Sequence, residues 1–359
     1  MLLDDGCNEV RTLAILAPDS DTYSELASVN KNEDWRRFPE LEAACVTVSR
    51  RSYWRKPEAV IHFLRCLLSD ESLRRLRGVW LPHRADPHEH RRDLDHARPL
   101  TELIPANMSP LACLLRDDRL ETWFQPIFHA HSFSLWGYEC LMRGRTQDGA
   151  IIGPERLIHW AHRQQLMFTL DCFSRKLHLH NVGRRRLADH AHIIVNFLPS
   201  TISQPEHCLD SSMEIVREHD INPARIIFKA VNSDACADHD HLGAILSLYR
   251  LQGFKVALDD LGNGPAGMVM LAALEPDLVK VGRYLVQRAP HSRSHRRMCA
   301  SLIEAAHEQN KLVLANGVEN SEEKSVMENL GVDLYQGYYF APPADEPVTT
   351  PMCVPANVG

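Results

Sequence analysis

The sequence predicts an α/β protein in which a (β/α)8 barrel of the TIM type follows a small α/β domain. From residue 111 onward, strand-like apolar runs recur about every 25 to 40 residues, with helical segments between them, as in βα units. Polar side chains stand at the ends of successive runs, where barrel enzymes place their chemistry. The length of 359 residues is enough for both parts.

The composition is that of an ordinary globular protein, with 44% hydrophobic and 24% charged residues. A formal net charge of −7 argues against non-specific binding to nucleic acid. The 10 cysteines are scattered without a CxxC motif, as expected for thiols in a reducing compartment. Acidic residues interrupt any N-terminal apolar region, and no apolar run is long enough to span a membrane. We therefore expect a cytoplasmic protein with neither a nucleic-acid nor a membrane partner.

The N-terminal domain, predicted over residues 1–82, contains three apolar runs and one helical pattern. The runs predict strands at 12–17, 45–48 and 78–82, and the spacing of 57–69 predicts a helix. Strands that alternate with helices favour a parallel sheet, as in receiver domains. No phosphorylatable acidic pair follows the first strand, however, and the third ends in Pro82. A degenerate sensor or docking domain is the better interpretation.

Residues 83–110 are predicted to form a polar linker and the helix that leads into the barrel. The part from 83 to 96 is rich in charges and histidines and poor in apolar residues. His88 and His90 are close enough to share a metal, although a flexible connector is the better-supported interpretation. The barrel is predicted over 111–345, and 346–359 form a tail.

The barrel region contains eight predicted strands and six predicted helices. The strands cover 124–128, 138–143, 193–197, 226–228, 254–259, 278–281, 312–315 and 334–336. The helices cover 154–162, 170–180, 213–219, 242–252, 296–309 and 322–330.

The run 255–264 is the most informative, because an apolar strand ends in Asp259 and Asp260 before a Gly-x-Gly turn. Taken alone, the pair is a strand cap, but polar residues recur at the other strand ends. These are Glu139, Arg143, Asn196, Lys229, Lys280, Asn316, Glu319 and Gln336. Their recurrence raises the prospect of a functional site.

These positions resemble the EAL family, the bacterial phosphodiesterases of cyclic di-GMP. The resemblance rests on FQPIF (124–128), GYECLMR (137–143), VNFLP (195–199), ALDDLGNG (257–264), LVKVGR (278–283), NGVEN (316–320) and LGVDLYQGYYF (330–340). It implies a modified TIM barrel whose first strand runs antiparallel to the others. It also implies a site where two divalent cations activate a water that opens the cyclic dinucleotide to linear pGpG.

The resemblance assigns roles to individual residues. The matching metal ligands are Glu139, Asn196 and Asp259, with Asp260 beside them, and Lys280 matches the lysine of the catalytic centre. The positions that match ligand-binding residues are Gln125, Glu139, Leu141, Arg143, Asn196, Asp259, Asp260, Lys280 and Gln336.

Four acidic positions of the family pattern have changed: Lys229 and Asn232 replace glutamates in strand four, Gly282 an aspartate, and Asn316 a glutamate. Together the changes make the site about five charge units more positive, close to the charge of two divalent cations. A lysine ammonium repels a metal ion and cannot ligate it. We therefore expect Lys229 to replace the metals as an ion pair with Glu139 and Asp259, leaving Asp260 and Lys280 as catalytic remnants.

Three functions follow from this pattern. The first is a catalytically inactive receptor for cyclic di-GMP that signals through the N-terminal domain. The second is a scaffold that has lost the nucleotide and works by protein–protein contacts. The third, a weakly active phosphodiesterase, requires Mg²⁺ or Mn²⁺; the other two require no cofactor. A protein partner would bind the N-terminal domain or the barrel, and a homodimer could form through 265–288.

Overall fold

The computed structural model describes residues 11–28, 35–38, 43–48, 75–82, 91–99, 110–164, 166–202, 205–231, 239–261 and 265–352. The chain divides into two compact units. The first comprises Met1–Arg119 and Arg145–Phe173, and the second Leu120–Gly144 and Ser174–Gly359. The predicted domain limits remain a prediction.

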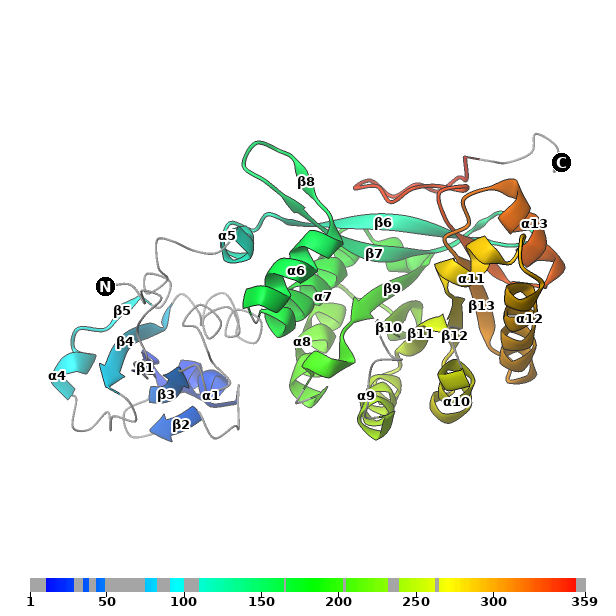
Figure 1. Cartoon of the computed structure of the whole chain (residues 1–359). Coiled ribbons are helices and arrows are strands. Elements are labelled where there is room, and N and C mark those ends of the chain that lie inside the picture. Colours follow the sequence, from blue (N-terminus) through cyan, green and yellow to red (C-terminus); the bar gives the residue numbers. More distant parts are fainter. Residues whose placement is uncertain are drawn as a thin grey trace. The chain divides into compact units, whose positions relative to one another are not determined.

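The N-terminal sheet has five strands in the order β2-β3-β1-β4-β5 (Figure 1). The strands are β1 Arg11–Leu16, β2 Trp35–Phe38, β3 Ala43–Val48, β4 Arg77–Pro82 and β5 Arg98–Pro99. Helix α1 (Ser20–Ser28) follows β1, and α4 (Arg91–Leu94) precedes β5. Every pairing in this sheet is antiparallel.

The predicted parallel sheet is therefore wrong. Only four residues separate β2 from β3, whereas a parallel pair needs a crossover of a dozen or more. The sequence analysis missed β2, so it did not recognise that β2 and β3 are joined by too short a segment for a parallel pair. It also placed 91–99 in the linker, although β5 pairs with β4 in the sheet. The predicted helix at 57–69 lies outside the described residues.

Eight strands form a closed barrel in the order β6-β14-β13-β12-β11-β10-β9-β7, and the pairing of β6 with β7 closes it (Figure 1). The strands are β6 Leu120–His129, β7 Leu135–Arg145, β9 His192–Phe197, β10 Ile226–Ala230, β11 Lys255–Leu261, β12 Leu278–Val281, β13 Leu312–Asn316 and β14 Leu334–Gln336. Strand β6 is antiparallel to both neighbours, and all other pairs are parallel. The barrel and its reversed first strand confirm the prediction.

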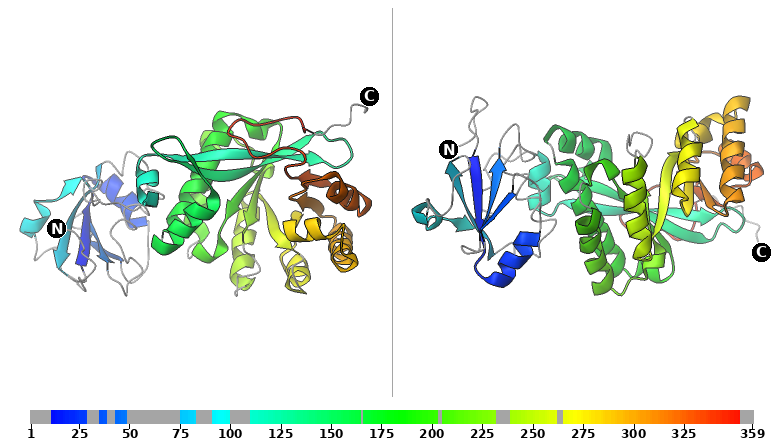
Figure 2. Two further views of the ribbon diagram at one scale, coloured as in Figure 1. Left: turned by 45° about the horizontal axis from the view of Figure 1, so that its top comes forward. Right: turned by 90° about the horizontal axis from the view of Figure 1, so that it is seen from below.

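Helices cover the outer side of the strands (Figure 2). Those of the second unit are the part of α7 (Met167–Arg184) from Ser174 onward, α8 Pro205–Glu218, α9 His239–Leu251, α10 Pro265–Leu274, α11 Arg283–Arg288, α12 Arg293–Glu308 and α13 Ser321–Asn329. Helix α6 (Pro154–Gln164) belongs to the first unit. Helix α5 (Pro110–Arg116) and the short strand β8 (Ile151–Ile152) belong to the first unit. The six predicted helices are present. Helix α10 was missed because its sequence, PAGMVMLAAL, is apolar on every side and carries no helical periodicity.

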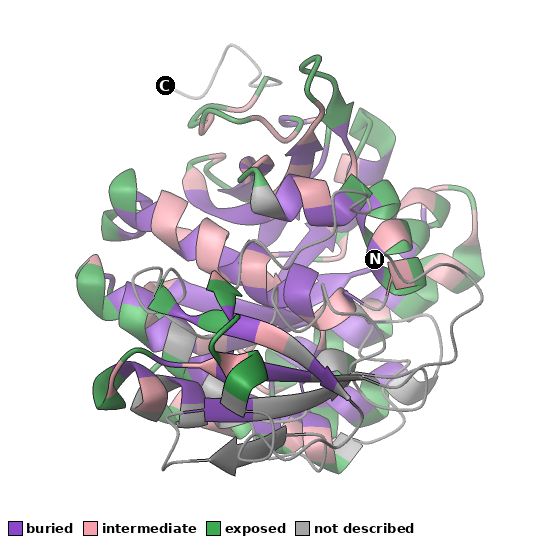
Figure 3. Cartoon of the chain, turned by 90° about the vertical axis from the view of Figure 1, so that its left-hand side faces the viewer, coloured by how far each residue is buried: buried purple, intermediate pink, exposed green. Residues whose placement is uncertain are grey.

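The barrel interior begins with a layer of apolar side chains, one from each strand. The layer comprises Ile127, Trp136, Ile194, Ile227, Ala257, Leu278, Leu314 and Leu334, all buried. Figure 3 colours the described residues by burial and shows buried residues on both strands and helices. This layer seals one end of the barrel and supports whatever lies next along each strand.

Candidate functional site

A polar layer lies directly beyond the apolar one. Side chains two residues apart on a strand share a face, so each strand that extends past the apolar layer adds one residue to the next layer. In six of the parallel strands, the polar residue follows the residue of the apolar layer by two positions. In β6, which runs in the opposite direction, the polar residue precedes it by two positions. In β7 the step is three residues, because its pairing with β6 is irregular near Ile127. The polar layer consists of Gln125, Glu139, Asn196, Lys229, Asp259, Lys280, Asn316 and Gln336.

The Glu139 carboxylate is the centre of this layer. Lys229 Nζ donates to its Oε1 over 2.7 Å, and Lys280 Nζ donates to its Oε2 over 2.7 Å. Gln336 Nε2 donates to Oε2 at 2.9 Å, and Asn196 Nδ2 donates to Oε1 at 3.2 Å. Glu139 is only 3% exposed, so its charge is compensated by protein groups.

Lys229 joins Glu139 to Asp259. Its Nζ also donates to Asp259 Oδ2 over 2.6 Å, so one buried ammonium bridges two carboxylates. The predicted ion pair of Lys229 with Glu139 and Asp259 is thus confirmed. The two lysines and two carboxylates of this cluster have equal and opposite charge, which satisfies the requirement that buried charges be paired.

The pKa values follow from this pairing. Burial by itself would raise the pKa of Glu139, but the charges of Lys229 and Lys280 outweigh it and hold the pKa well below its ordinary value. Asp259 behaves in the same way: burial raises its pKa, and Lys229 and Lys280 lower it further than burial raises it. Burial would lower the pKa of Lys229, yet Asp259 and Glu139 raise it above its ordinary value. Lys229 is therefore a cation at neutral pH.

These residues do not fit the divalent cations that the resemblance implies. Both oxygens of Glu139 accept hydrogen bonds from ammonium groups, and Asp259 Oδ2 accepts a third. A protonated ammonium offers no lone pair to a metal and repels it at this range. The donor set that Mg²⁺ or Mn²⁺ prefers is thus already committed to lysine.

Two side-chain oxygens in the polar layer can each accept a further hydrogen bond. Asn196 Oδ1 and Gln336 Oε1 are buried and lack a hydrogen-bond partner among the residues that the structure describes. Gln336 also donates to Gln125 Oε1 at 3.3 Å, which joins Gln125 to the cluster. The backbone at Gln336 packs closely on Val318: its carbonyl accepts from Val318 N at 3.1 Å, and a Cβ on Gly337 would lie 2.0 Å from the carbonyl oxygen of Val318.

The remaining predicted ligand-binding residues lie on β7 and β11. Leu141 and Arg143 share the face of β7 that carries Glu139, and both are half-buried. Arg143 Nη1 donates to the carbonyl of Met142 at 2.8 Å, and its guanidinium lies 5.3 Å from the centre of the Trp123 ring. Asp260 lies in β11, but the structure does not describe its side chain.

The substituted positions that the structure describes lie at the same end of the barrel. Asn316 ends β13 and is half-buried, and Gly282 precedes the first turn of α11. Asn232 lies outside the described residues. Two carboxylates that could compensate for lost ones are engaged elsewhere: Asp277 accepts from Val256 N at 2.9 Å, and Glu319 pairs with Arg283.

Sequence reasoning found the members of the cluster but missed one connection. It assigned Gln336 to the nucleotide, whereas its amide also donates to Glu139. The contact of Gln336 with Glu139 could have been predicted, because Gln336 ends its strand in the same way as the other members of the polar layer.

Comparison with known proteins supports the resemblance. A model of the EAL domain matches residues 109–343. The chain belongs to the EAL-domain family. Among curated relatives, it is 25% identical over 234 residues to the probable cyclic di-GMP phosphodiesterase PdeG of Escherichia coli K12, which covers 64% of this chain and 45% of PdeG. The chain spans less than half the length of the first curated relatives that it matches.

Solved EAL-domain structures share the fold. A standalone EAL protein from Vibrio cholerae O395, solved with cyclic di-GMP, has a TM-score of 0.56 at 26% identity over 63% of this chain and 92% of that one. The FimX EAL domain of Xanthomonas citri, in complex with cyclic di-GMP, has a TM-score of 0.60 at 20% identity over 72% of this chain and 97% of that one. Among the described residues, no helix has the length and apolar character needed to cross a membrane.

Replacing Lys229 by methionine should lower the free energy of unfolding by about 3–5 kcal/mol, because Glu139 and Asp259 lose their shared cation while staying buried. Urea denaturation followed by circular dichroism measures this loss. Lys324→Met is the matched control: Lys324 pairs with Glu328 on the surface of α13, and its loss should cost less than about 1 kcal/mol. Equal losses in the two variants would contradict the proposed role of Lys229.

Stability should fall in acid because of the cluster. The pKa values of Glu139 and Asp259 are lowered from ordinary values of 4.5 and 3.8. Their contribution is therefore complete above those values and is lost as the pH falls toward the lower folded pKa values. The raised pKa of Lys229 places its own loss at alkaline pH, above 10.5. Urea titrations below pH 5 should show a steeper loss of stability in the wild type than in Lys229→Met; parallel curves would exclude the cluster as the cause.

Proposed function

We propose that this EAL-domain protein is a catalytically inactive receptor for cyclic di-GMP that passes the signal to a protein partner. The observation that carries the proposal is the Lys229 ammonium, buried between Glu139 and Asp259 where the family pattern has a glutamate. It supports an ion-paired site in place of a metal centre. The N-terminal domain, the barrel surface or a second copy of the chain would receive the signal.

The loss of catalysis has independent support from the other substitutions. The amide of Asn316 cannot take a proton from water at neutral pH, so it cannot serve as a general base. Gly282 offers no side chain to the site. Without a metal-bound water and a base, the chain lacks both means of generating a nucleophile at neutral pH.

Retention of binding is supported by groups that survive around the cluster. Arg143 lies on the same face of β7 as Glu139, and a guanidinium fork matches the geometry of a phosphate. Asn196 Oδ1 and Gln336 Oε1 are buried acceptors for a donor on a ligand or on a water that bridges to one. The solved Vibrio cholerae and Xanthomonas citri EAL structures contain cyclic di-GMP.

A second candidate is a nucleotide-free scaffold that works through protein–protein contacts. One observation favours it: the charges of Lys229 and Lys280 are already neutralised by Glu139 and Asp259. A dianionic ligand would meet a cluster without net charge there and would rely on Arg143 and neutral hydrogen bonds. The receptor and the scaffold therefore differ in whether Arg143 and its neighbours bind phosphate.

Isothermal titration of the full chain with cyclic di-GMP, without divalent metal, separates the two candidates. The receptor should bind at micromolar concentration or tighter, and Arg143→Ala should weaken binding by about 1.5–3 kcal/mol, the value of a charged hydrogen bond. Arg297→Ala, on an exposed position of α12, is the control and should leave affinity unchanged. Absence of heat at high ligand concentration would favour the scaffold, and production of pGpG with Mg²⁺ or Mn²⁺ would overturn both.

Replacing Lys229 by glutamate should make the protein dependent on divalent metal. The substitution removes the ammonium and adds a third carboxylate beside Glu139 and Asp259, so like charges crowd together unless a cation enters. Thermal melts should show a lower midpoint in chelator and a midpoint raised by Mg²⁺ or Mn²⁺, because a metal that binds only the folded state stabilises it. The wild type should melt at the same temperature with and without Mg²⁺, and an equal rise with Mg²⁺ in both proteins would refute the metal-free site.

A further inference from the structure

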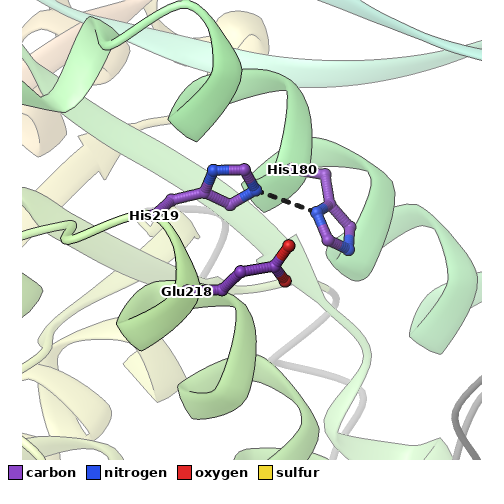
Figure 4. A group of neighbouring side chains, drawn as sticks. All are labelled: His180, Glu218 and His219. Carbon is purple, nitrogen blue, oxygen red and sulfur yellow. Dashed lines mark hydrogen bonds between the residues drawn. The ribbon is translucent and has the colours of Figure 1, made fainter.

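Two histidines and a glutamate meet on the outside of the barrel, away from the polar layer. His180 projects from α7, and Glu218 and His219 lie at the end of α8, with the two imidazoles facing each other (Figure 4). His180 Nδ1 and His219 Nε2 are 3.0 Å apart and share a hydrogen bond. The ligating atoms of all three residues lie within 4.8 Å of one another.

The packing of α7 against α8 places the His219 ring beside His180. A Cβ on Gly183 would lie 2.3 Å from Cγ of His219, so the ring occupies the space that any other residue at 183 would fill. Gly183 follows His180 by three residues and therefore lies on the same face of α7. Glycine inside a helix costs about 0.5–1 kcal/mol relative to alanine, and here it admits the second imidazole.

The position of the cluster in the barrel favours a cation. Helices α7 and α8 both end where the following strands, β9 and β10, begin, so the cluster lies at the end of the barrel opposite the polar layer. The carbonyl ends of both helices carry partial negative charge there. The nearby Arg185 and Arg186 are each paired with a carboxylate, Glu346 and Asp189 respectively, which limits their repulsion of a metal ion.

We propose that His180, Glu218 and His219 form a binding site for a divalent transition-metal ion, Zn²⁺ in the first place, which joins α7 to α8. Zn²⁺ bonds to imidazole nitrogen and carboxylate oxygen at about 2.0–2.2 Å, which places tetrahedral ligands about 3.3 Å apart. The two imidazole nitrogens, 3.0 Å apart, are close to that spacing. The side chain of Glu218 is exposed, so it can move from within 4.8 Å of the imidazole nitrogens to the ligand spacing.

Binding changes only protons and ligands. Both imidazoles must present a lone pair, so the ring that donates in the hydrogen bond changes tautomer and carries its proton on the other nitrogen. The three protein ligands leave a fourth position for water. Imidazole ligands select Zn²⁺ over Mg²⁺, which prefers oxygen ligands and keeps its waters, so Mg²⁺ should not compete for this site.

The test uses the full chain, stripped of metal with a chelator and titrated with Zn²⁺. The wild type should bind one more equivalent than the double variant His180→Gln/His219→Gln. At a hundredfold excess over Kd, that equivalent should raise the melting midpoint by about 5–10 °C. The matched control is His159→Gln/His162→Gln, an exposed pair one turn apart on α6, which should keep the equivalent. Equal stoichiometry and equal midpoint shifts in the wild type and the His180/His219 variant would overturn the proposal.

Two further measurements cover the case in which the double variant does not fold. Glu218 is exposed, so Glu218→Gln should fold and should weaken Zn²⁺ binding by at least about 10-fold. Co²⁺ bound to the wild type should show visible bands of a nitrogen–oxygen site without thiolate charge transfer. A thiolate spectrum alone would assign the metal to the cysteines, and unchanged affinity in Glu218→Gln would exclude the proposed three-residue site.

Discussion

The buried carboxylate of Glu139 is the constraint on which this end of the barrel depends. A charge that is 3% exposed must be matched inside the protein, and Lys229 and Lys280 match it, one at each oxygen. Asn196 and Gln336 complete its hydrogen bonds. Because Lys229 also donates to Asp259, the Glu139 carboxylate and the Lys229 ammonium together link six strands: β7, β9, β10, β11, β12 and β14.

This arrangement explains why acidic residues persist in a site whose other acidic positions have changed. Once a lysine lies between Glu139 and Asp259, removing either carboxylate leaves a buried, undercompensated ammonium, which is strongly destabilising. The two carboxylates are thus retained by the energetics of folding, whatever the site does. Their presence in the sequence therefore does not by itself support phosphodiesterase activity, and the identity of residue 229 is the more informative observation.

The sequence was sufficient to predict the barrel but not to predict the antiparallel N-terminal sheet. Strands β12 and β14 match their predicted limits, because short apolar runs between turn residues leave little freedom. The partners of Lys229 were also predictable, since parallel strand ends converge and charges must pair. Strand direction in the N-terminal sheet was not, because alternating strands and helices do not fix direction once a strand such as β2 is overlooked. The His180–Glu218–His219 cluster was missed for a related reason: only the packing of α7 on α8 brings those residues together.

The charge balance also suggests why a receptor could arise from an enzyme of this fold. An enzyme gains rate only from interactions that strengthen in the transition state, and a metal-bound nucleophile is the strongest of these in the family pattern. A receptor gains from holding its ligand unchanged, which neutral hydrogen bonds and one arginine can provide. An ammonium fixed at position 229 removes the first kind of interaction while leaving Arg143, Asn196 and Gln336 in place. In the proposed receptor, the change of charge sign at position 229, together with Asn316 and Gly282, would separate ligand recognition from ligand turnover.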